Sequence, residues 1–107
     1  MKEKQKSIFD VFKYDLADMN LMTEFLEACD WDEDMMDKQL KIAKDCLECH
    51  YLTPSLKKYK DFEDWLDQRV VAQLLDVGLT KLQAEILKKS IINSMNEMMY
   101  FDKLEDN

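Results

Sequence analysis

The sequence predicts an all-α protein, a compact bundle of four to five helices joined by short turns. Glycine and proline occur once each, as Gly78 and Pro54, whereas sheets built from hairpins need such turn residues at short intervals. Apolar residues recur at spacings of three and four along most of the chain, which is the periodicity of amphipathic helices. The length of 107 residues and the 47% hydrophobic content predict a single domain over 1–107, with 1–6 and 102–107 frayed.

The first helix is expected to begin after Ser7, because Ser7 and Asp10 have the spacing of a capping box. Its apolar positions are Ile8, Val11, Phe12, Leu16, Met19, Met22, Phe25, Leu26 and Cys29. Whether this helix is continuous or broken near residues 18–20 is left open. Asp30 and Glu33 repeat the capping-box spacing and predict a second helix over about 32–51. Its apolar stripe is Met36, Leu40, Ala43 and Leu47, ending at His50.

A third helical region is expected from Thr53-Pro54, because proline at the first helical position sacrifices no hydrogen bond; a restart at Asp61 is left open. Apolar residues then occupy nearly the whole circumference of 70–79 (VVAQLLDVGL), which places this segment at the centre of the core or in a homodimer interface. That interface would use Val70, Val71, Leu74 and Leu75.

Gly78 suits the left-handed position that ends a helix, and Thr80 with Gln83 forms a third capping box. The last helix is therefore predicted from Lys81 to about Phe101. Its apolar stripe is Ala84, Leu87, Ile91, Met95 and Met98.

The charge of the chain is strongly acidic and unevenly placed. Fifteen basic and 23 acidic residues give a formal charge of −8, which repels the phosphates of nucleic acids. Residues 15–37 contain nine carboxylates and no lysine or arginine. Such a surface favours a basic protein partner, although a solvated face with helix-capping acids is an equal interpretation. The residues predicted to bind that partner are Glu27, Asp30, Asp32, Glu33, Asp34 and Asp37.

The stretch DCLECH (45–50) has the pattern of covalent haem attachment, but that chemistry requires an exported protein, and neither a signal peptide nor a second histidine is present. Zinc is the stronger metal hypothesis, because Cys46, Cys49 and His50 share one helical face and Cys29 could complete a four-ligand site. Packing of two thiols and a histidine along an apolar stripe explains the same pattern without a metal. No cofactor is predicted.

Two further motifs are incomplete. Residues 30–34 (DWDED) begin like a calcium loop, but the sixth position is Met35 instead of glycine and the twelfth is Lys41 instead of glutamate. Residues 71–89 have the rhythm of a DNA-binding helix-turn-helix, with Lys81, Lys88 and Lys89 on its second helix. Against this stand the charge of −8 and the presence of a single arginine.

No nucleophile, base and orienting group can be assembled around one histidine, so an enzyme is not predicted. A cytoplasmic location is expected, because no signal peptide or membrane span is evident and the cysteines are odd in number. The leading hypothesis is a small acidic module that binds and inhibits or regulates a basic protein, for example one that binds nucleic acid. Antitoxins, immunity proteins and phage inhibitors are of this type by size and charge. The alternatives are a small dimeric helix-turn-helix regulator and a zinc-stabilised domain.

Overall fold

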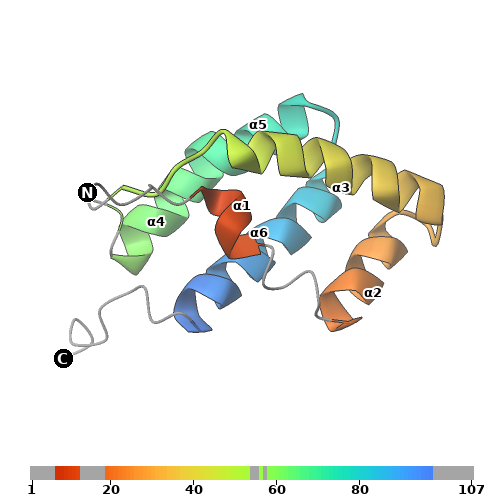
Figure 1. Ribbon diagram of the computed structural model, residues 1–107, viewed down its shortest axis with the longest axis horizontal. Helices are drawn as coiled ribbons and strands as arrows, with labels where there is room; N and C mark the ends of the chain where they lie inside the picture. The colour runs from red at the N-terminus through yellow and green to blue at the C-terminus, as the bar shows by residue number, and fades with distance from the viewer. Residues whose placement is uncertain (1–6, 13–18, 54–55, 57, 98–107) are drawn as a thin grey trace, which may run out of the picture.

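The computed structural model describes residues 7–12, 19–53, 56 and 58–97, and these residues form an all-α bundle, as predicted (Figure 1). The helices in chain order are α1 (Ile8–Phe12), α2 (Met19–Ala28), α3 (Glu33–Glu48), α4 (Tyr59–Trp65), the π-helix η3 (Leu66–Val71), α5 (Ala72–Asp76) and α6 (Lys81–Glu97). Residues 19 and 20, near which a break in the first helix was left open, begin α2, whereas residue 18 falls in 13–18, the Pro54 boundary at 54–55 and the end of the last helix in 98–107. These three segments lie outside the described residues.

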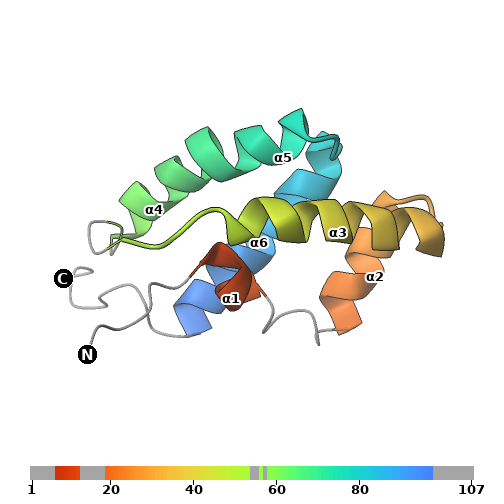
Figure 2. The same ribbon diagram turned by 45° about the horizontal axis from the view of Figure 1, so that its top comes forward.

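Two long helices organise the bundle. The helix α6 packs against α1, α2, η3 and α5, while α3 packs against α1, α2 and α5. Figure 2 shows α3 lying between the α4–α5 segment on one side and α1 and α2 on the other. The stripe predicted for α6 is fully buried at Ala84, Leu87, Ile91 and Met95. Amphipathic periodicity therefore predicted the buried face of this helix correctly.

Two of the three predicted capping boxes are present. The amide of Asp10 donates to Oγ of Ser7 at 3.3 Å, and the amide of Ser7 donates to Asp10 at 3.2 Å. Thr80 and Gln83 exchange two equivalent bonds, both of 3.1 Å. Each box satisfies two amides at a helix start that have no partner within the helix.

The box predicted at Asp30 and Glu33 is wrong, because Asp32 and not Asp30 caps α3. Oδ1 of Asp32 accepts from the amides of Asp34 at 3.0 Å and Met35 at 3.1 Å. Asp30 has a φ of 59° and belongs to the end of α2. A left-handed residue cannot take the extended conformation of an N-cap, so the cap moves two residues along.

The segment 70–79 is buried along one side only, which corrects the prediction of burial around its circumference. Val70, Val71, Leu74 and Leu79 are buried, whereas Leu75 and Val77 are 42% and 41% exposed. The wider turn of η3 places the adjacent Val70 and Val71 together on the core side. Three of the four residues predicted for a homodimer interface thus belong to the chain's own core, and that interface has no support.

Candidate functional site

The six carboxylates predicted to bind a partner lie along the end of α2, the α2–α3 turn and the start of α3. We call them the acidic surface: Glu27, Asp30, Asp32, Glu33, Asp34 and Asp37. All six are exposed, and none forms an ion pair with a described lysine or arginine. Three of them, Asp32, Glu33 and Asp34, stand at the positive end of the α3 dipole. The sequence-predicted residues are thus brought onto one end of the molecule.

The α2–α3 turn holds two residues with left-handed backbones. The amide of Trp31 donates to the Leu26 carbonyl at 2.9 Å and the amide of Asp30 donates to the Glu27 carbonyl at 3.0 Å. This pair of bonds is the Schellman motif, which usually places glycine where Asp30 stands. Trp31 follows with a φ of 62° and a side chain that is 61% exposed. A tryptophan is therefore held in a strained conformation within the acidic surface.

The α5–α6 turn repeats the same motif with glycine in the left-handed position. The amide of Leu79 donates to the Leu74 carbonyl at 3.0 Å and the amide of Gly78 donates to the Leu75 carbonyl at 3.2 Å. Gly78 has a φ of 118°, which a residue with a side chain rarely adopts. Leu74 and Leu79 are both buried, as expected for the apolar contact that accompanies this motif.

Two buried glutamines connect these turns. Nε2 of Gln39 on α3 donates to Oε1 of Gln83 on α6 at 2.8 Å and to the Gly78 carbonyl at 3.2 Å. Nε2 of Gln83 donates to the Ala28 carbonyl at 3.2 Å and to Sγ of Cys29 at 3.4 Å. Gln83 is 1% exposed and Gln39 is 9% exposed. The end of α2, the middle of α3 and the α5–α6 turn are thus fixed to one another by hydrogen bonds, of which the one between the two glutamine side chains is buried.

A groove of about 500 Å³ lies between the start of α3 and the α5–α6 turn. Its walls include Asp32, Asp34, Met35 and Lys38 from one side and Gly78 and Thr80 from the other. The two buried glutamines also line it and supply its polar floor. Sequence reasoning missed the glutamines and Trp31 as site residues. The one local signal for Gln39 is its position four residues before the buried Ala43, on the same helical face.

The four zinc candidates do not meet. Cys29 ends the α2 segment beside the N-cap of α3, whereas Cys46 lies fourteen residues along α3, or about 21 Å at 1.5 Å per residue. Cys29 and Cys46 are buried and Cys49 is exposed. Burial raises the pKa of the Cys46 thiol to about 11 and also raises the pKa of Cys29. No three histidine, cysteine, aspartate or glutamate side chains come together to hold a metal within the described residues.

His50 takes part in packing at the end of α3. Its Nδ1 lies 2.9 Å from the Cys46 carbonyl oxygen. Its ring meets Trp65 edge to face, with centroids 6.1 Å apart. This arrangement matches the packing interpretation of the DCLECH stretch.

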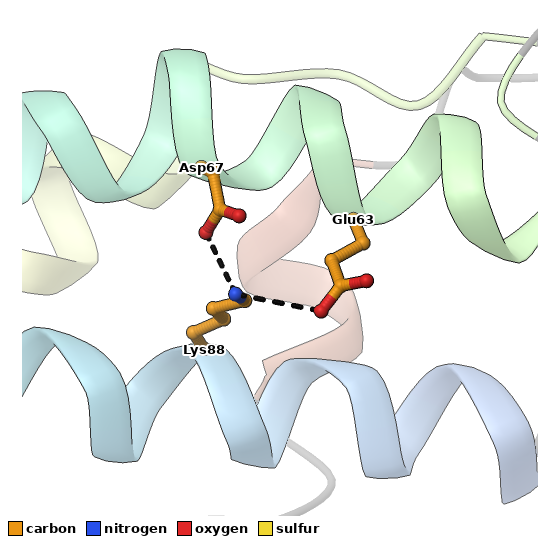
Figure 3. Close-up of polar contacts among 3 residues, drawn as sticks. All are labelled: Glu63, Asp67 and Lys88. Carbon is orange, nitrogen blue, oxygen red and sulfur yellow. Dashed lines mark ion pairs between the residues drawn. The ribbon is translucent and has the colours of Figure 1, made fainter.

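The three lysines of the helix-turn-helix hypothesis differ in how free they are to bind phosphate. Lys88 reaches from α6 to two carboxylates, with Nζ 2.7 Å from Oδ1 of Asp67 and 3.6 Å from Oε2 of Glu63 (Figure 3). The hydrogen bond to Asp67 is the main cause that raises the pKa of Lys88. Of these three lysines, Lys81 and Lys89 are exposed. One of the three predicted phosphate-binding lysines is therefore neutralised within the chain.

Among the described helices, none has the length and apolar character needed to cross a membrane. Comparison with protein-family models, curated proteins and solved structures found no match to this chain.

Proposed function

We propose that this protein is a cytoplasmic, non-enzymatic module that binds a basic protein partner through the acidic surface and inhibits or regulates it. The observation that carries this proposal is the exposure of all six carboxylates without an ion pair to a described basic side chain. Like charges held on one surface repel each other, and a basic partner relieves that repulsion on binding. A protein whose basic groove binds nucleic acid has the required charge, as in antitoxin, immunity and phage-inhibitor systems.

The thiols and the histidine support the other parts of this proposal. All three cysteines are free, and the thiol of Cys49 is exposed. An exposed free thiol suits a reducing compartment. His50 is the single histidine, and its ring is engaged with the Cys46 carbonyl and with Trp65. Packing at the end of α3 accounts for both contacts, so the position of the ring is explained without a catalytic role.

The test is capture of proteins from a cell lysate by the immobilised chain and by two charge-reversal variants. The first variant replaces Glu27, Glu33, Asp34 and Asp37 by lysine and spares Asp32, because Asp32 caps α3. The control variant replaces four exposed carboxylates elsewhere by lysine, namely Asp45, Glu48, Asp64 and Glu97. Each reversal changes the charge by two, so both variants have a formal charge of zero instead of −8.

We expect the natural chain and the control variant to retain the same basic protein, and the first variant to lose it. Retention should weaken as salt concentration rises, because exposed charges are screened. Equal retention by a folded first variant contradicts the proposal. Tight binding of duplex DNA or heparin at moderate salt also contradicts it and supports the dimeric helix-turn-helix alternative.

A further inference from the structure

Exposed apolar side chains gather at the same end of the molecule as the acidic surface. Seven large apolar side chains are exposed among the described residues, and five of them lie in residues 31–35 and 75–82. These five are Trp31, Met35, Leu75, Val77 and Leu82. Trp31 and Leu82 are the most exposed of all, at 61% and 60%. A concentration of apolar surface on two adjacent segments marks an interaction site more strongly than scattered exposure does.

The groove between α3 and the α5–α6 turn is bordered by these two segments, and one of the five apolar residues, Met35, is part of its lining. Met35 is 41% exposed and lines the groove, while Trp31 and Leu82 are the immediate sequence neighbours of the lining residues Asp32 and Gln83. The volume of about 500 Å³ is enough to take large side chains of a partner. The bonds of Gln39 and Gln83 fix both walls before a ligand arrives. Little ordering is therefore needed on binding.

The charge around the groove selects the occupant. Residues 30–39 and 75–83 contain six carboxylates and two lysines, which leaves a local charge of −4. A second copy of this chain would bring two such surfaces together, and the repulsion opposes that arrangement. The occupant must combine apolar side chains with positive charge.

We infer that the groove receives an amphipathic helix of a partner protein. Large apolar side chains of that helix enter the groove against Met35 and extend onto the exposed Trp31 and Leu82, each of which is next in sequence to a lining residue. Its arginine and lysine side chains face Asp34 and the rest of the acidic surface. This is helix-in-groove recognition, in which apolar anchors supply most of the affinity and charges supply orientation. The inference rests on the proposed function and specifies how the basic partner is held.

The test uses a library of synthetic basic helices. Each peptide carries leucine, methionine or phenylalanine along one helical face and lysine or arginine on the others. Each also has a scrambled twin of the same composition in which the apolar residues are spread around the helix. Binding is read from the fluorescence of Trp31 in the Trp65→Phe background, which leaves Trp31 as the single tryptophan.

We expect the best amphipathic peptides to bind about tenfold or more tightly than their scrambled twins and to shift the Trp31 emission to shorter wavelength. Met35→Gln and Leu82→Gln should remove that preference, because Met35 lines the groove and Leu82 is the exposed apolar residue next in sequence to the lining residue Gln83. The control Tyr51→Ser, which removes an apolar side chain exposed elsewhere, should retain it. Circular dichroism and urea unfolding establish that each variant is folded.

Two outcomes overturn the inference and differ in their meaning. If no amphipathic peptide binds more tightly than its twin, the groove is not a helix site, yet charge-dependent capture from lysate would leave the proposed function standing. If the preference survives both Met35→Gln and Leu82→Gln, the apolar contact lies elsewhere on the chain. The proposed function is tested separately: if capture from lysate does not depend on the acidic surface, the proposed function is wrong.

Discussion

Gln39 and Gln83 meet between α3 and α6, where Nε2 of Gln39 donates to Oε1 of Gln83 at 2.8 Å. Both side chains also bond to backbone groups in the turns, so one pair of residues connects segments far apart in the sequence. Buried polar networks of this kind stabilise a fold only while every member has a partner. The stability of this end of the molecule therefore depends on the pair remaining intact.

Replacing Gln83 by alanine should lower the free energy of unfolding by about 2–3 kcal/mol, because the buried Gln39 loses one of its two acceptors and the Ala28 carbonyl and the Thr80 amide lose their bonds to Gln83. The control is Gln73→Ala on the exposed face of α5. This substitution should change the free energy of unfolding by less than about 0.5 kcal/mol. Urea unfolding measures both. The double variant Gln39→Ala/Gln83→Ala completes the comparison. If its loss of unfolding free energy equals the sum of the losses of the two single variants, the glutamines do not act as a pair.

The helix caps give a second prediction. Asp32→Ala should cost about 1 kcal/mol of stability, because the amides of Asp34 and Met35 lose their acceptor. Asp30→Gly should cause no loss, since glycine adopts the left-handed conformation that Asp30 holds. Thermal or urea unfolding of the two variants measures both changes in stability. A larger loss from Asp30→Gly than from Asp32→Ala would restore Asp30 as the cap.

These two aspartates show what local spacing can and cannot predict. The boxes at Ser7 and Thr80 were predictable because each depends on residues three apart in one helix. Asp30 and Asp32 are chemically equal as caps, and the choice between them is made by the hydrogen bonds that end α2. The π-helix was not predicted either, because the residues of 66–71 carry no local signal for its wider turn.

The candidate site also has one part that could be predicted from the sequence and one part that could not. Its carboxylates fall within eleven consecutive residues, 27–37, so their common location could be predicted from the sequence. The groove could not be predicted, because it depends on a contact between residues 39 and 83, which lie 44 positions apart. Trp31 gave no local signal either, since its exposure follows from a backbone conformation that tryptophan rarely adopts.

Thiol reactivity tests the separation of the zinc candidates. In the folded protein, a thiol reagent should react rapidly with Cys49 and slowly with Cys29 and Cys46, because the last two are buried and burial raises their pKa. All three should react after unfolding. The Cys49→Ser variant should therefore lose the rapid phase, and metal analysis should find no bound zinc. Stoichiometric zinc that protects Cys46 and Cys49 together would support the zinc-stabilised alternative.

The ion pair of Lys88 predicts a pH dependence. The folded protein raises the pKa of Lys88 above its ordinary value of 10.5, chiefly through Asp67. The stabilisation is therefore complete below about pH 10 and is lost as the pH rises through the raised pKa. Asp67→Asn should lower the free energy of unfolding at neutral pH by about 1 kcal/mol or less. The difference from the natural chain should shrink at alkaline pH, and a constant difference would contradict this assignment.

The strain at Trp31 can be separated from the contacts of its ring by two substitutions. Trp31→Ala and Trp31→Asn remove the same ring, but asparagine tolerates the left-handed backbone while alanine does not. We therefore expect the asparagine variant to be more stable than the alanine variant by about 1 kcal/mol in urea unfolding. Both should bind the amphipathic basic peptides more weakly than the natural chain, because both lack the exposed ring. Equal stability of the two variants would show that the turn relaxes without the ring. The tryptophan would then impose its own conformation on the turn.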